Sequence, residues 1–233
     1  MIFVHIGAGA GDLDHTANYR DGFSEFTKNH KSKIKEIFVV EANPKNIKKL
    51  KKCWQNYELV KIFNFAITAN RIKNKKIKFY YCEKDAPYYK LFSTDINHIK
   101  HYFPKSKIKN TLIKTIKIKN FMNKNFKKKK IDYFSIDVEG NDFDIIMDLE
   151  LKKYDIQNIS LEYLHLNIKE KKRILKKLIK NGYSYNGFGV DHHNIDWSFE
   201  KKVNIWNNWI SKLMPFIHRK HYKRLNKFLI SNG

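Results

Sequence analysis

Short apolar runs recur along the chain at intervals that suit buried β-strands. The first covers Ile2–Val4 and Ile6, and further strand-like runs follow at Ile37–Val40, Tyr133–Ile136 and Asn158–Tyr163. Continuous apolar runs are typical of parallel strands that helices cover on both faces. We therefore predict an α/β fold with a mostly parallel sheet.

A helical period appears after the second of these runs. Asn43 directly before Pro44 predicts a helix start, because Asn caps helices well and proline is tolerated at the first helical position. Ile47, Leu50 and Trp54 then place one apolar stripe along this helix.

Three more helices are expected from their end signals. One is short and lies around Phe23–Asn29. Another is capped by Asn141, with Asp142 and Asp144 in its first turn, where acids suit the helix dipole. The last ends at Gly182, a typical helix terminator.

The remaining strands are predicted to flank this framework. Val60–Thr68 is expected to be the third strand, and Ile77–Cys82 an edge strand of a hairpin. Thr111–Lys119 alternates apolar and polar residues, as a strand does. Tyr183–Val190 and Ile195–Phe199 are expected to form an antiparallel pair that closes the sheet.

A glycine-rich turn follows the first strand. Gly7, Gly9 and Gly11 occupy every second position with only alanine between them, so the backbone can approach a ligand closely. A strand that leads into such a turn and then a helix is the pattern of a nucleotide pocket. Glu41, at the tip of the next strand, is placed to accept hydrogen bonds from ribose hydroxyls. The polar stretch Asp12–Gly22 is expected to form a loop over the pocket.

Carboxylates also follow the strand Tyr133–Ile136. Ligands of open α/β sheets bind at the carboxyl ends of the strands, where Asp137 and Glu139 are expected. Only Val138 separates the two acids, so extended backbone would point both to the same side.

These pieces together resemble the FkbM-type S-adenosylmethionine (SAM) methyltransferases. The resemblance spans roughly residues 1–199, and the segment ending in D-x-E-G is its most specific piece. The matching segments are HIGAGAGD at 5–12, VVEANPKNIKKL at 39–50, NFAIT at 64–68, IDYFSIDVEGNDFDII at 131–146 and ISLEY at 159–163.

The resemblance implies a Rossmann-like class I methyltransferase fold: a seven-stranded, mostly parallel sheet with helices on both faces. We expect the methyltransferase domain to cover residues 1–200, with an irregular insertion at 84–110 near the acceptor side. It further implies SAM as the cofactor. His5 stands where the family usually has an acid that supports the methionine amino group. The residues expected to bind the cofactor are His5, Gly7, Ala8, Gly9, Gly11, Asp12, Glu41, Ala42, Asn43, Asn64, Ala66 and Asp137.

The family also implies a hydroxyl acceptor on a sugar, glycan or secondary metabolite. A hydroxyl is a weak nucleophile and usually needs a base. The candidate catalytic residues are Asp137, Glu139, Glu162 and His165. We predict no metal site, because Asp137 and Glu162 have no evident third ligand.

The net charge of +24 raises the alternative of an RNA methyltransferase. Only five of the 47 basic residues are arginine, however, and nucleic-acid readers rely heavily on arginine for base edges and phosphates. We therefore expect no sequence-specific nucleic-acid partner. A third alternative is a SAM-binding protein with impaired catalysis, for which His5 is the only hint.

Residues 201–233 differ from the rest, since they hold eight Lys or Arg residues and no acid. Trp206, Trp209, Leu213 and Ile217 mark one face of a basic amphipathic helical tail. Such a face packs on its own domain, on a dimer partner or on an anionic membrane. No stretch is long and apolar enough to span a membrane, no signal peptide precedes the first strand, and Cys53 and Cys82 lack metal-site spacing. We expect a cytoplasmic protein in which the tail packs on its own domain or on a dimer partner, with peripheral membrane contact through residues 201–233 as the alternative.

Overall fold

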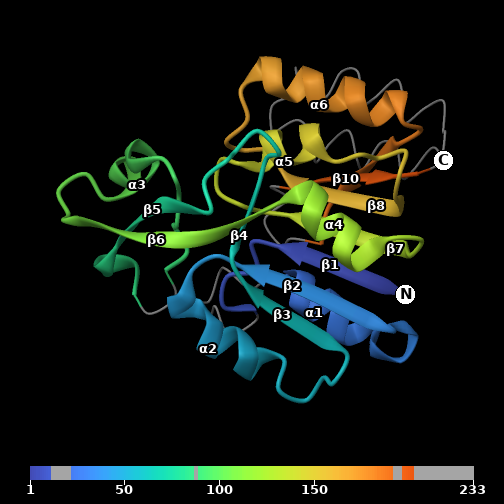
Figure 1. Ribbon diagram of the computed structural model, residues 1–233, viewed down its shortest axis with the longest axis horizontal. Helices are drawn as coiled ribbons and strands as arrows, with labels where there is room; N and C mark the ends of the chain where they lie inside the picture. The colour runs from blue at the N-terminus through green and yellow to red at the C-terminus, as the bar shows by residue number, and fades with distance from the viewer. Residues whose placement is uncertain (12–21, 87–88, 191–195, 202–233) are drawn as a thin grey trace.

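The computed structural model describes residues 1–11, 22–86, 89–190 and 196–201, and its centre is a seven-stranded sheet. The strand order is β3-β2-β1-β7-β8-β10-β9 (Figure 1). The first five strands are parallel, and β10 and β9 form the predicted antiparallel pair. Their bounds are β1 Ile2–Ile6, β2 Glu36–Glu41, β3 Val60–Asn64, β7 Lys130–Ile136, β8 Asp155–Glu162, β9 Ser184–Phe188 and β10 Asp196–Glu200.

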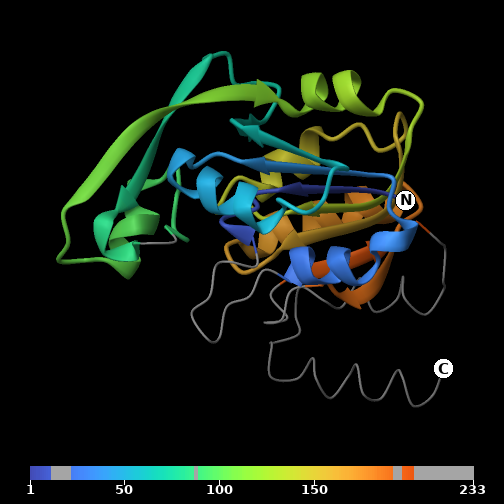
Figure 2. The same cartoon turned by 90° about the horizontal axis from the view of Figure 1, so that it is seen from below.

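Helices cover both faces of this sheet, as predicted. Figure 2 shows α4 on one side of it and α1 on the other. Alternate residues of β1 point to opposite faces of the sheet. Val4 and Ile6 pack in the larger core with α4, α5 and α6, and Phe3 packs in a second core with α1 and α2. The helices are α1 Gly22–Asn29, α2 Pro44–Cys53, α4 Ile118–Phe126, α5 Asp142–Asp148 and α6 Ile168–Lys180, with a 3₁₀ turn at Lys31–Lys33.

Helix ends follow the sequence signals at two of three places. Asn43 caps α2 by accepting a hydrogen bond from the backbone of Lys45 at 3.1 Å, and Gly182 ends α6 with φ +82°. Asn141 occupies the N-cap position of α5 but makes no capping hydrogen bond. Its amide nitrogen instead lies 3.4 Å from Thr94 Oγ, so a tertiary contact replaces the expected local one.

The expected third strand is in fact two strands in different sheets. Val60–Asn64 forms β3, but the chain then leaves the main sheet at Phe65, and β4 (Ala66–Thr68) pairs with β6 (Ile108–Lys117). Aromatic packing fixes this bend, since Phe65 lies 5.6 Å from Phe63 and 6.1 Å from Phe121 between ring centroids. The predicted strand at 111–119 also ends early, because α4 begins at Ile118.

A second, three-stranded sheet of order β4-β6-β5 results, and it extends beyond the carboxyl ends of the main strands (Figure 1). β5 (Lys76–Cys82) pairs antiparallel with β6, as the predicted hairpin requires. Segment 84–110 is less irregular than expected, because it contains α3 (Ile96–Tyr102) and the start of β6, after a 3₁₀ turn at Glu83–Asp85. This sheet has a small core of its own.

Three expectations lie outside the described residues: the loop at 12–21, the junction at 191–195 and the basic tail from 202 onward. Among the helices of the described part, none has the length and apolar character that a membrane crossing requires.

Candidate active site

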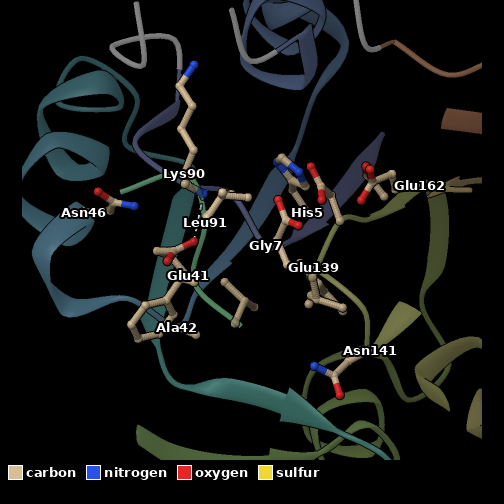
Figure 3. A pocket seen from close by; sticks show the side chains of 18 of the residues that line it. His5, Gly7, Glu41, Ala42, Asn46, Lys90, Leu91, Glu139, Asn141 and Glu162 are labelled. Carbon is tan, nitrogen blue, oxygen red and sulfur yellow. Dashed lines mark hydrogen bonds between the residues drawn. The ribbon is translucent and has the colours of Figure 1, made fainter. Parts of the chain in front are cut away.

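A cavity of about 520 Å³ opens at the carboxyl edge of the parallel strands. Its walls come from both sheets: Glu41 ends β2 and Asp137 directly follows β7 of the main sheet, and Phe79 belongs to β5 of the small one. In Figure 3, Glu41 and Asn46 lie on one side of the cavity and Glu162 on the other, with Gly7 between them. The cavity therefore joins the glycine turn to the acids that follow β7 and β8.

The glycine turn is required by packing as well as by ligand access. Gly7 has φ +92°, and a Cβ atom there would lie 1.5 Å from the backbone oxygen of Asp137. Gly11 has φ +67°, and its Cβ would lie 2.7 Å from Cys53 Sγ on α2. Side chains at these two positions would push β1 away from β7 and α2, so the turn locks three elements together.

Glu41 closes the other side of this turn. Its carboxylate accepts hydrogen bonds from the backbone nitrogen of Gly9 at 2.8 Å and from that of Asn43 at 2.6 Å. The Asn64 amide donates to the backbone oxygens of Glu41 and Ala42 at 2.9 and 3.2 Å. The acid at the tip of β2 is therefore fixed in place, as a ribose-binding carboxylate has to be.

Five carboxyl groups lie close together at the opposite end of the cavity, and all of them except Asp142 line it. Burial raises the pKa of Asp137 well above its usual range, and the nearby Glu162, Glu139, Asp196 and Asp142 raise it further. Burial likewise raises the pKa of Asp142 to about 8, although its Oδ1 accepts a hydrogen bond from the Val138 nitrogen at 3.2 Å. A cationic ligand is the natural partner for this end.

Glu139 does not have the extended backbone that the sequence pattern suggested. Its φ is +50°, in the left-handed region that a non-glycine residue rarely adopts. Ser93 Oγ donates a hydrogen bond to its backbone oxygen at 3.1 Å, which ties this strained turn to the small sheet's side of the cavity. Its side chain still lines the cavity together with that of Asp137.

His165 lies between two of these acids. Its Nε2 is 3.4 Å from Glu139 Oε2 and 3.3 Å from Glu162 Oε1. Interactions with Glu139 and Glu162 raise the pKa of His165 to about 10. The imidazole is therefore protonated at neutral pH and pairs electrostatically with the carboxylates, so it is unsuited to be the base.

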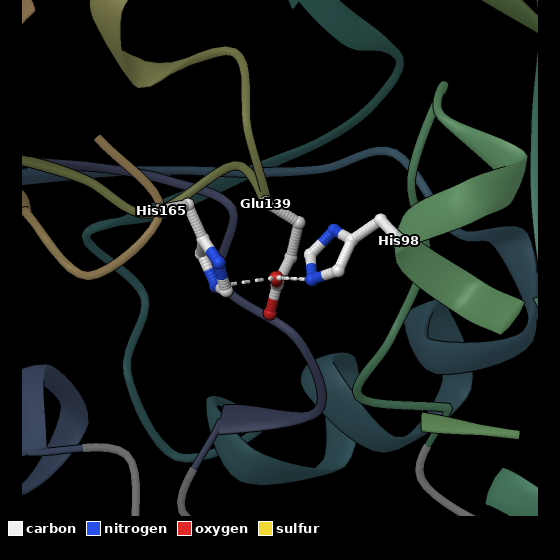
Figure 4. Close-up of side chains that lie close together, drawn as sticks. All are labelled: His98, Glu139 and His165. Carbon is white, nitrogen blue, oxygen red and sulfur yellow. Dashed lines mark ion pairs between the residues drawn. The ribbon is translucent and has the colours of Figure 1, made fainter. Parts of the chain in front are cut away.

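His98 of α3 reaches the same carboxylate from the other side (Figure 4). Its Nε2 lies 3.6 Å from Glu139 Oε2, and the two imidazole rings are 4.5 Å apart between centroids. Burial lowers the pKa of His98, which keeps this ring neutral.

Most of the predicted site residues come together at this cavity. Asn43 and Asn64 do not line it and instead support the Glu41 turn, whereas Asp12 lies outside the described residues. His5 is buried in the wall, with its ring 4.4 Å from that of Phe23. The predicted residues in the lining are His5, Gly7, Ala8, Gly9, Gly11, Glu41, Ala42, Ala66, Asp137, Glu139, Glu162 and His165.

Several lining residues were not predicted. Tyr89, Lys90, Leu91 and Phe92 come from the segment whose pattern is hardest to interpret, where aromatic residues are scattered among charges. Asp196 is also in the lining, at the start of β10. It falls inside the strand predicted at Ile195–Phe199, so the pattern gave no signal of a site residue there.

Comparison with known proteins agrees with this geometry. A model of the methyltransferase FkbM domain matches residues 5–185. The chain belongs to this family. The resemblance predicted from the sequence is therefore confirmed, as are the class I methyltransferase fold and the family's cofactor, SAM.

Similar solved structures include the FkbM methyltransferase of Methylobacillus flagellatus, with 11% identity and a TM-score of 0.45 over 84% of this chain and 42% of that one. The fibrillarin of Aeropyrum pernix, solved with natively bound SAM, has 10% identity and a TM-score of 0.38 over 85% and 64%. The chain thus spans about two fifths of the M. flagellatus protein. No curated protein matches it significantly. The family assignment therefore rests on the FkbM domain match.

Proposed function

We propose that this FkbM-family chain transfers a methyl group from SAM to a hydroxyl group of a sugar, glycan or secondary metabolite. One observation supports this most directly. A single cavity has the glycine turn and Glu41 at one end and Glu139, Glu162 and His165 at the other. A donor and a hydroxyl acceptor can therefore be held in line within one space, as a displacement at a methyl group requires.

The cofactor end fits SAM in shape and charge. Glu41 would bind the ribose hydroxyls, and Ala66 would lie near the adenine. The glycine turn leaves room for the methionine part, and Asp137 would hold its amino group. The convergent carboxyl groups suit the positive charges of the cofactor. Bound SAM supplies an electrophilic methyl group on a sulfonium.

Glu139 is the residue that we assign to the acceptor hydroxyl. Its carboxylate lines the cavity and is held by contact with the protonated His165. It would accept the hydrogen bond of the hydroxyl and take its proton as the new carbon–oxygen bond forms. Glu162, on the other side of His165, is the next candidate for this role.

Aromatic residues on the small sheet's side suit a hydroxylated acceptor. Phe79 and Phe92 stack with their ring centroids 4.7 Å apart, and both line the cavity. Tyr89 and Lys90 add polar groups beside them. An apolar wall with a few polar groups is the usual form of a small-molecule site.

The test is to measure methyl transfer from radiolabelled SAM to a panel of mono- and oligosaccharides and hydroxylated aromatic compounds. For an accepted compound, Glu139→Gln should lower turnover by roughly 10²–10⁴-fold, the usual range for loss of a general base, with SAM affinity nearly unchanged. Glu150→Gln, whose side chain is not in the cavity lining, is the matched control. Wild-type turnover in Glu139→Gln would move the role to Glu162. Transfer to no hydroxyl compound, with RNA or protein methylated instead, would refute the proposed acceptor class.

A further inference from the structure

Two imidazoles and one carboxylate converge beside the cavity, and the proposed methyl transfer gives no role to one of them, His98. His98 comes from α3, Glu139 from the turn after β7, and His165 from the segment after β8. Figure 4 shows the two rings on either side of the Glu139 carboxylate. The nitrogen and oxygen atoms that they offer all lie within 4.8 Å of one another. Three separate parts of the chain thus deliver nitrogen and oxygen atoms to one point.

The separations are longer than those of hydrogen bonds. Glu139 Oε2 lies 3.4 Å from His165 Nε2 and 3.6 Å from His98 Nε2. Hydrogen bonds between such atoms are about 2.7–3.2 Å long. Neither His98 Nε2 nor Glu139 Oε2 has a hydrogen-bond partner among the described residues, although both atoms are buried. Buried polar atoms of this kind normally have a partner, which here is missing.

The separations match those between the ligand atoms of a metal ion. Zinc–nitrogen bonds are about 2.0–2.1 Å long and zinc–oxygen bonds about 2.0–2.2 Å, so two ligand atoms of a tetrahedral site are roughly 3.3–3.5 Å apart. The separation between Glu139 and His165 falls in this range, and that between Glu139 and His98 is close to it.

The surrounding charge favours a cation at this point. Glu162 Oε1 lies 3.3 Å from His165 Nε2, and Asp137 lies close enough to Glu139 and Glu162 for electrostatic repulsion between them. A divalent ion would offset the mutual repulsion of these carboxylates.

We propose that His98, Glu139 and His165 form a binding site for a divalent transition-metal ion of the Zn²⁺ type. Two imidazoles with one carboxylate are the ligands that such ions prefer, whereas Mg²⁺ and Ca²⁺ prefer oxygen ligands alone. Three protein ligands leave a further position for water or a substrate oxygen, as in catalytic zinc sites. The proposal departs from the expectation of no metal site, which considered only Asp137 and Glu162 as ligands.

The ion would displace the proton of His165 and would itself hold the Glu139 carboxylate, so the site is compatible with the role assigned to Glu139. A carboxylate that binds an ion through one oxygen keeps the other, so Oε2 can serve the ion and Oε1 the acceptor hydroxyl. Because Glu139 and His165 line the cavity, an ion held here would lie at its edge. The proposal concerns metal binding alone and does not depend on the proposed reaction.

The test is calorimetric titration of the full chain with Zn²⁺ and, separately, Mg²⁺ after chelator treatment. We expect one Zn²⁺ per chain and much weaker Mg²⁺ binding. His98→Gln and His165→Gln should each weaken Zn²⁺ binding at least ~100-fold, more than the usual effect of losing an outer-shell partner. His101→Gln is the matched control, because His101 lies on the same helix but is exposed. It should bind Zn²⁺ as the wild type does.

A second measurement needs only the wild-type chain. Zn²⁺ should shift the imidazole C–H resonances of His98 and His165, but not those of His101, in NMR spectra of the chain. Unchanged Zn²⁺ affinity in both His→Gln variants, imidazole resonances of His98 and His165 that do not shift with Zn²⁺, or no measurable Zn²⁺ binding would each overturn the proposal. The first of these outcomes would place the ion on other histidines of the chain.

Discussion

Replacing Asp142 with Asn should make the protein more stable at alkaline pH. The Asp142 side chain is only 2% exposed, and burial raises its pKa from 3.8 to about 8. The unfolded chain releases this proton near pH 4, but the folded chain retains it until about pH 8. Folded molecules therefore bind more protons across this window, and stability falls as the pH rises from about 4 to 8.

The size of the effect follows from the pKa difference. Each pKa unit corresponds to about 1.36 kcal/mol, so a shift from 3.8 to about 8 corresponds to ~6 kcal/mol of lost stability above pH 8. This is an upper limit, because repulsion from Glu162 contributes to the shift and the other acids titrate with Asp142. Asn keeps an oxygen that can accept the hydrogen bond from the Val138 nitrogen and carries no charge.

The assay is urea unfolding of wild type and Asp142→Asn at pH 5 and pH 8.5, in the presence of a chelator. The gain in unfolding free energy of the variant should be larger at pH 8.5 than at pH 5 by at least ~2 kcal/mol, about a third of the upper limit given above. Asp144→Asn is the control, because Asp144 lies in the same helical turn but pairs with Arg71. It keeps the Asp142 carboxyl, so it should not show the larger stability gain at pH 8.5. An equal difference at both pH values would refute the assignment of a buried, proton-retaining carboxyl to Asp142.

Two further predictions concern ligands. Glu41→Ala should weaken SAM binding by about 1–3 kcal/mol in calorimetry, because hydrogen bonds to a charged group are lost. Glu58→Ala, which replaces an exposed acid, should leave SAM affinity unchanged. Equal SAM affinities of the two variants would refute the assignment of Glu41 to the ribose. Random RNA should bind no tighter than ~10⁻⁶ M in filter binding at ~0.15 M salt, the range of non-specific contacts. Sub-micromolar binding would instead favour the RNA methyltransferase alternative.

The cofactor half of the site was largely predictable from the sequence because its signals are local. The glycine turn after β1, the acid at the end of β2 and the capped helix at Pro44 each depend on neighbours within a few residues. Parallel strands with continuous apolar runs then bring the ends of β1, β2 and β7 together in a known way.

The other half depends on contacts between distant segments. The left-handed backbone of Glu139 is supported by Ser93, which lies 46 residues away in the sequence. His98 meets His165 only because α3 packs on the small sheet, and neither histidine carries a spacing signal. The break at Phe65 likewise depends on Phe121 of α4. A reading of local pattern cannot detect any of these three features.

The small sheet has its own hydrophobic cluster of Ala66, Phe79, Tyr81, Phe92 and Ile113, separate from the two cores of the main sheet. Three of its residues, Ala66, Phe79 and Phe92, line the cavity. None of these residues belongs to the two main-sheet cores, so this wall can be changed without replacing a residue of those cores. A chimera that transplants residues 71–110 from another FkbM protein would test this separation.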